Sequence, residues 1–191
     1  MNLKAILVFL IFLHNFSNLY ADDFSDISDD IEFCESCHGL KGAQPIDGTI
    51  PILAGQHFYY LYIQLKDLSS GLRFNEVMND IAASYDKGQM KRFSQYFSEQ
   101  TWPNTEYRTE ASLISKAESA IAAGQCVQCH RGSFVGDSQI PRVSNQSFNY
   151  LKKTMHDYKA KIRNNAPAKS SLFASFKDED LEALASYLAG M

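Results

Sequence analysis

Apolar residues recur three and four positions apart along most of the chain, which is the spacing of one face of an α-helix. The apolar runs are separated by polar or proline-containing segments, where helices begin and end. The pattern predicts six main helices and therefore an all-α fold. The helices span residues 25–37, 58–68, 87–100, 112–129, 147–163 and 178–189. Acidic residues at 178–180 fall at the N-terminal end of the last helix, where negative charge is favourable.

The chain repeats itself. Two C-x-x-C-H segments begin at Cys34 and Cys126, which are 92 residues apart. A proline segment and a Tyr-Leu pair follow each of them, and corresponding residues there keep an offset of 90. The repeat predicts two tandem domains with the same helix order. We place the first at residues 22–101, a polar, proline-containing linker at 102–110, and the second at 111–191.

The first 21 residues have the pattern of a secretory signal peptide. Lys4 precedes an apolar run over residues 5–13, and a polar stretch ends at Ala21. The alternative is a retained membrane anchor, but the apolar run is shorter than the roughly 20 residues of a spanning helix. We expect residues 1–21 to be removed after export.

Composition excludes one class of function. The formal net charge is -4 at pH 7, and the chain has no run rich in lysine and arginine. We therefore expect no nucleic-acid binding. The four cysteines of an exported chain would ordinarily suggest two disulfides, but a histidine directly follows each pair.

The C-x-x-C-H motif is the attachment signal of a c-type heme. Cys34 and Cys37 lie three residues apart near a helix end, so their thiols reach the two vinyl groups of one porphyrin. Cys126 and Cys129 have the same arrangement. One such motif alone also occurs in redox and zinc sites, but a duplicated pair in an exported chain favours heme. The sequence predicts two covalently bound heme c groups.

His38 and His130 complete the two motifs and are the predicted proximal iron ligands. The second ring N–H of such a histidine usually has a hydrogen-bond acceptor. Pro51 and Pro141 are the candidates, because a proline carbonyl accepts this bond and the missing proline N–H lets the chain pass close to the ring. The alternative is that both prolines only delimit helices.

The sixth iron ligand sets the reduction potential, and methionine opposite histidine raises it. Met78 is our candidate in the first half, in a loop-like stretch 18 residues before Tyr96. Met90 is the competitor. It corresponds to Leu181 in the second half, so we expect it in the helix core.

The second half has no methionine at the equivalent position. The residue 18 positions before Tyr187 is Lys169, and no methionine lies between Met155 and Met191. A lysine amine binds iron once it is deprotonated, and burial lowers the lysine pKa. Lys169 is therefore our candidate ligand. The alternatives are an open or water-bound iron, Met155, which we expect in the core, or His156, which we expect to be exposed.

Two arginines, one histidine and an aromatic run also have expected positions. Arg73 and Arg163 occupy equivalent positions and either neutralise heme propionates or lie on the surface. His57 starts a helix, where we expect it on the surface. The aromatic run at 58–62 is expected to pack, with some rings beside a heme edge.

The segments CESCHGLKG, PILAGQHFYYLYIQL and GLRFNEVM, with the helix through Tyr96, resemble the cytochrome c4 family over nearly the whole mature chain. The resemblance implies two class I cytochrome c domains with a pseudo-twofold relation and facing heme propionates. It also implies histidine and methionine on each iron. This sequence matches that rule at His38, Met78 and His130 but departs from it at Lys169.

The resemblance further implies a periplasmic electron carrier, free or membrane-associated, and not an enzyme. Its partners would be redox proteins of the periplasm or inner membrane, such as a terminal oxidase or a sulfur-oxidising dehydrogenase. One alternative is the dedicated electron-accepting subunit of a sulfide or thiosulfate dehydrogenase. Another is a heme enzyme that binds a small molecule at an open second heme.

Overall fold

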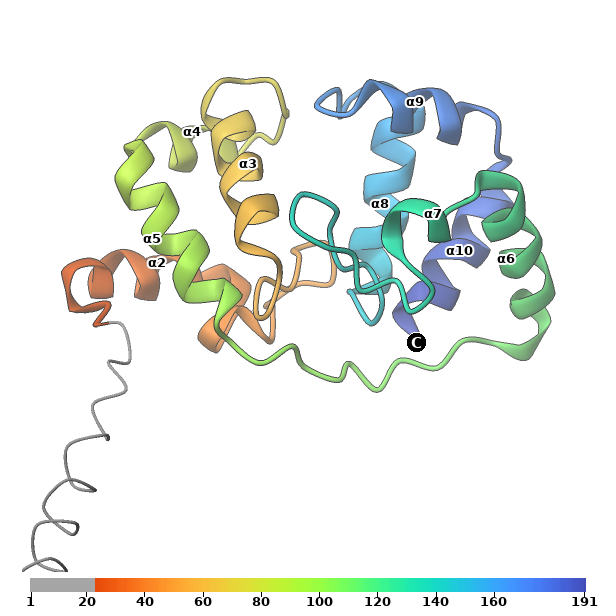
Figure 1. Ribbon diagram of the computed structural model, residues 1–191, viewed down its shortest axis with the longest axis horizontal. Helices are drawn as coiled ribbons and strands as arrows, with labels where there is room; N and C mark the ends of the chain where they lie inside the picture. The colour runs from red at the N-terminus through yellow and green to blue at the C-terminus, as the bar shows by residue number, and fades with distance from the viewer. Residues whose placement is uncertain (1–22) are drawn as a thin grey trace, which may run out of the picture.

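The structure is a computed structural model that describes residues 23–191, and its regular structure over that range is helical (Figure 1). The predicted all-α fold is confirmed. The signal segment predicted at residues 1–21 lies outside the described residues. In chain order the helices are η1 (Ser25–Ile27), α2 (Ser28–His38), η2 (Leu40–Gly42), α3 (Phe58–Ser69), α4 (Met78–Ala83), α5 (Lys87–Ser98), α6 (Ala111–Gly124), α7 (Val127–His130), α8 (Phe148–Lys159), α9 (Pro167–Ala174) and α10 (Asp178–Ala189).

The helices form two groups whose order follows the sequence repeat. In the first group α3 packs against α4 and α5, and in the second α8 packs against α9 and α10. The two groups lie side by side, and residues 101–110 run beneath them without helical structure (Figure 1). The tandem arrangement of two helical domains is therefore confirmed.

Two short helices, α4 and α9, were not predicted. Met78, expected in a loop-like stretch, is instead the first residue of α4. The Asn75 side chain starts this turn, because its Oδ1 accepts hydrogen bonds from the amides of Val77 (3.2 Å) and Met78 (2.8 Å). Pro167 opens α9, where its missing N–H costs no helical hydrogen bond. Asn75 and Pro167 each favour the start of a short helix, which a search for long amphipathic helices does not detect.

Two predicted helices of the second half end earlier than expected. The helix predicted at 112–129 divides into α6 and α7 at Gln125, whose φ of 49° and ψ of 37° are left-handed. The helix predicted at 147–163 ends at Lys159, and Lys161 has a φ of 58°. A left-handed residue ends the right-handed helical path, although apolar periodicity continues beyond it.

Apolar residues from α6, α8 and α10 form the core of the second half, and Ile27, Ile31 and Phe93 form a smaller cluster in the first. Met155 belongs to the larger cluster and is 5% exposed. Met90 is 3% exposed in α5. Both methionines are core residues, as the sequence predicts.

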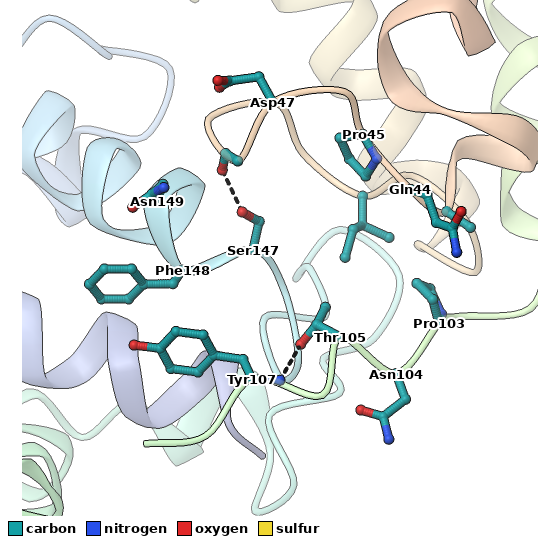
Figure 2. A pocket seen from close by; sticks show the side chains of 13 residues that line it. Gln44, Pro45, Asp47, Pro103, Asn104, Thr105, Tyr107, Ser147, Phe148 and Asn149 are labelled. Carbon is teal, nitrogen blue, oxygen red and sulfur yellow. Dashed lines mark hydrogen bonds between the residues drawn. The ribbon is translucent and has the colours of Figure 1, made fainter. Parts of the chain in front are cut away.

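The two halves meet at equivalent positions. Arg73 and Arg163 form an isolated antiparallel bridge between them. A groove also follows the boundary where the linker crosses it (Figure 2). There the Ser147 hydroxyl donates a hydrogen bond to the Gly48 carbonyl of the other half. Neither cysteine nor histidine is among the residues that line this groove, so it is not a heme site.

The residue after each C-x-x-C-H motif has the same unusual backbone conformation. Gly39 has φ 77° and ψ 167°, and Arg131 has φ 65° and ψ 170°. This region suits glycine and strains residues that have a Cβ. At Gly39 an added Cβ would lie 2.0 Å from the Gln44 carbonyl oxygen. The second half therefore has a strained residue where the first has a relaxed one.

We expect Arg131→Gly to raise the free energy of unfolding by about 1 kcal/mol, because it relieves this strain. Arg131→Ala is the control. It keeps the strain and loses only the exposed ion pair with Asp137, so its stability should stay within about 0.5 kcal/mol of the unaltered protein. Denaturant unfolding measures both variants, and a glycine variant no more stable than the alanine variant contradicts the strain.

Candidate heme sites

The two C-x-x-C-H motifs lie at helix ends, and none of their four cysteines is paired in a disulfide. The first motif forms the C-terminal end of α2, and the second consists of the N-cap residue Cys126 and the whole of α7. In each motif the first cysteine is half-buried and the second is exposed. Burial raises the pKa of Cys34 to about 11 and also raises that of Cys126.

A proline carbonyl orients the histidine of each motif. The distance from His38 Nδ1 to Pro51 O is 2.9 Å, and that from His130 Nδ1 to Pro141 O is 3.0 Å. The predicted role of both prolines as acceptors is confirmed. For these bonds Nδ1 must carry the proton, so Nε2 is the nitrogen with a free lone pair.

Both imidazoles are held neutral. Burial lowers the pKa of His38, and the charge of Arg73 lowers it further against the opposing effect of the Pro51 hydrogen bond. Burial also lowers the pKa of His130, together with the charge of Lys169. Neutral imidazole is the form that binds a metal ion. Each histidine is therefore oriented and protonated as an iron ligand requires.

An apolar cavity lies beside the second motif and extends to the boundary between the halves. Its walls come from α8, α9 and α10 and from the proline segments of both halves. Cys126, Cys129, His130 and Lys169 all line it. The structure thus brings together every site residue predicted for the second heme.

The cavity wall has cations but no carboxylate. Arg73, Arg142, Arg163 and Lys169 line it, and neither aspartate nor glutamate is among its lining residues. Arg142 Nε is buried without a hydrogen-bond partner, and the guanidinium lies 4.9 Å from the centroid of the Trp102 ring. A buried cationic donor without a partner favours an anionic group. Heme has an apolar ring and two carboxylates, so this set of residues fits a heme.

Lys169 enters the cavity from α9, near its N-terminus. Its Nζ lies 5.6 Å from the centroid of the Tyr158 ring. Burial lowers the pKa of Lys169 to about 8, and the charge of Arg163 contributes. The amine is therefore readily deprotonated, in the cavity that His130 also lines. Of the two other candidates, Met155 lines the cavity as a core residue of α8. His156 lies 3.7 Å from the Asp178 carboxylate and does not line the cavity.

Met78 is half-buried at the start of α4, in the same half as His38. It does not line the cavity of the second motif, and neither does His38. The Asn79 side chain holds the preceding loop, because its Nδ2 donates to the carbonyls of Leu68 (2.6 Å) and Arg73 (2.8 Å). These hydrogen bonds hold the loop that leads into α4, and Met78 is the first residue of that helix.

The boundary between the halves contains polar residues that the sequence did not single out. Gln64 Oε1 accepts from Arg163 (2.7 Å) and from Arg73 (3.1 Å). Arg163 is 4% exposed, so the surface reading of this residue is wrong. Tyr60 and Tyr150 each accept a hydrogen bond from an arginine of the other half at 3.3 Å. Tyr60 and Tyr150 lie 90 residues apart, and this recurrence in the sequence could have identified them.

His57 is also more than a helix-surface residue. Its Nε2 lies 2.8 Å from the Val135 carbonyl oxygen of the other half, within hydrogen-bond distance. The expected surface position is therefore wrong, because the start of α3 faces the second domain.

Two helical domains, each with a C-x-x-C-H motif and an oriented histidine, define a c-type cytochrome. The family model for cytochrome c matches residues 115–191. Cytochrome c4 of Thiocapsa roseopersicina is 30% identical to this chain over 83% of the chain and 86% of its own length. The chain belongs to the cytochrome c4 family. It binds two covalently attached heme c groups and is an electron-transfer protein.

Two further proteins are similar to this chain. The reduced recombinant cytochrome c4 of Pseudomonas stutzeri shares its fold, with a TM-score of 0.79, 24% identity, and coverage of 90% of this chain and 100% of the other. A protein of Stutzerimonas stutzeri (strain A1501), named thiosulfate dehydrogenase electron acceptor, is 27% identical over 83% of this chain and 78% of its own length.

Proposed function

We propose that this protein is a periplasmic electron carrier with two inequivalent hemes. Cys34 and Cys37 would attach the first heme, and His38 and Met78 would bind its iron. The observation that supports inequivalence is the position of Lys169 in the cavity that His130 lines, where the repeat offers no methionine.

The second heme has a different ligand set. Cys126 and Cys129 would attach it, and His130 and Lys169, which line the same cavity, would bind its iron. Burial and neighbouring positive charge favour the neutral amine of Lys169, which is the form with a lone pair. Arg142 and Arg163, which line the same cavity, neutralise the heme carboxylates.

When bound, each heme supplies an iron that alternates between the ferric and ferrous states. The chain fixes the proximal imidazoles through Pro51 and Pro141, so little rearrangement accompanies a change of charge. The cavity wall that would hold the second heme is largely apolar. These residues bind and tune the hemes, and none is assigned a catalytic role.

The partners are redox proteins of the periplasm or inner membrane. The relative named thiosulfate dehydrogenase electron acceptor supports a second candidate, in which this chain serves one sulfur-oxidising dehydrogenase. Steady reduction by a purified dehydrogenase of that kind, but not by respiratory donors, would favour the dedicated role.

Carbon monoxide distinguishes a carrier from a heme enzyme. We expect the reduced protein to bind carbon monoxide slowly, because two protein ligands would occupy each iron. Lys169→Ala is the matched comparison and should bind carbon monoxide rapidly at half of its heme, as followed by absorption. Rapid binding to half the heme of the unaltered protein contradicts the carrier proposal and favours an open second heme.

Export is tested separately. The mature protein should be recovered from the periplasmic fraction with its N-terminus near residue 22. Across residues 23–191 the structure contains no helix long and apolar enough to cross a membrane. Recovery with residues 1–21 still attached, in the membrane fraction, would favour the anchor alternative.

A further inference from the structure

Two glutamines cross the boundary between the halves in mirrored fashion. Gln56 and Gln146 are each 3% exposed and follow the proline segment of their own half. Gln146 Oε1 accepts from the Ile52 amide at 2.9 Å, and its Nε2 donates to the Ile52 carbonyl at 3.0 Å. Gln56 makes the same pair of bonds with Arg142, both at 2.9 Å. Each glutamine thus pairs with backbone of the opposite half.

The residues that receive these bonds directly follow the two prolines that orient the histidines. The Pro51 carbonyl and the Ile52 amide belong to one peptide group. On one side this group accepts from His38 Nδ1, and on the other it donates to Gln146. The peptide group between Pro141 and Arg142 joins His130 to Gln56 in the same way. Each proximal imidazole is therefore one peptide group away from a side chain of the other domain.

We propose that each glutamine tunes the heme of the opposite domain: Gln146 the heme held by His38, and Gln56 the heme held by His130. The inference rests on the proposed function, in which these histidines are the proximal ligands. Both glutamines are positioning residues, since they act through a peptide group and a histidine.

Hydrogen bonds in a chain polarise one another. Donation from the Ile52 amide to Gln146 increases the negative charge on the Pro51 oxygen, which then accepts more strongly from His38. A stronger acceptor makes the imidazole a more basic ligand. A more basic ligand stabilises ferric iron and lowers the reduction potential. The second glutamine bond, to the Ile52 carbonyl, keeps the peptide group in this orientation.

The test is a crossed pair of variants in the full-length holoprotein. Gln146→Met keeps the length of the side chain but removes both hydrogen bonds to Ile52, together with the one that Oε1 accepts from the adjacent Ser147 amide. The potential of the first heme should therefore rise more than that of the second. Gln56→Met should have the reverse effect. Potentials are measured by redox titration. A larger shift at the heme of the variant's own half, or no shift at either heme, overturns the proposal.

The hemes are assigned without reference to their sixth ligands. Nuclear Overhauser contacts between heme methyls and residues of each half identify which potential belongs to which heme. A wrong ligand at Met78 or Lys169 therefore leaves the test intact. If the protein does not contain two hemes per chain that are reduced reversibly, the proposed function itself fails, and heme quantification reports this independently.

Glutamate provides a second route if the methionine variants do not fold. Gln146→Glu keeps an oxygen acceptor for the Ile52 amide and strengthens it, so the potential of the first heme should fall. Asn149→Asp is the control for charge alone, because Asn149 is exposed and is not the hydrogen-bond partner of Ile52. A fall no larger in Gln146→Glu than in Asn149→Asp overturns the proposal.

Discussion

Lys169→Met is expected to bring the two reduction potentials closer together by raising the potential of the second heme. A thioether stabilises ferrous iron relative to an amine ligand, and the variant would reproduce the ligand set proposed for the first half. It should also show a second sulfur-to-iron charge-transfer band in the absorption spectrum of the oxidised protein. Redox titration and absorption spectroscopy measure the two effects.

Lys153→Met is the matched control for this change. Lys153 lies on α8 of the same half, but it is exposed and pairs with Asp157 one helical turn away. Its replacement should alter neither potential nor spectrum. If Lys169→Met is as silent as this control, lysine is not the ligand of the second iron.

Acidification provides a further check on the same residue. Burial, aided by the charge of Arg163, lowers the pKa of Lys169 to about 8, so the amine gains its proton and loses its lone pair as the pH falls. The oxidised protein should therefore lose the lysine ligand on acidification, seen as a spectral change at half of its heme. Lys169→Met has no amine at this position and should lack that transition.

The largest expected effect on stability is that of Arg163→Met. The guanidinium donates to Gln64 and Tyr60 of the first half and to Asn165 of its own half. It also lies 4.7 Å from the centroid of the Tyr158 ring. Methionine fills a similar volume without these donors and leaves buried acceptors unpaired. We expect the free energy of unfolding to fall by about 3 kcal/mol in denaturant unfolding.

Arg131→Met is the exposed counterpart. Its ion pair with Asp137 is open to solvent on both sides, and pairs of this kind contribute about 1 kcal/mol or less. Similar losses in the two variants would mean that the buried bonds of Arg163 contribute no more than a surface pair. Both variants must carry the same number of hemes per chain when their free energies of unfolding are compared.

Much of the fold could be predicted because the sequence contains the same pattern in two tandem copies. The helices α3, α5 and α10 were found from apolar periodicity to within two residues at each end. The proline acceptors of His38 and His130 followed from their repeated position after the motifs. The breaks at Gln125 and Lys161 did not, since nothing in these side chains requires a left-handed backbone.

The contacts between the halves were beyond sequence reasoning for a different reason. Gln56 and Gln146 occupy equivalent positions of the repeat, yet their partners are 86 and 94 residues away in the chain. No local pattern states which peptide group a buried amide will contact. The same holds for Arg163, whose burial depends on a tyrosine of the other domain.

The mirrored glutamine bonds also describe how the chain is assembled. Each domain contacts the other through equivalent residues, as the two subunits do at the isologous interface of a symmetric homodimer. The linker at residues 101–110 joins the two partners, so the pairing is intramolecular and its strength does not depend on protein concentration. In this respect the molecule is a homodimer made from a single chain, whose two members are free to acquire different iron ligands.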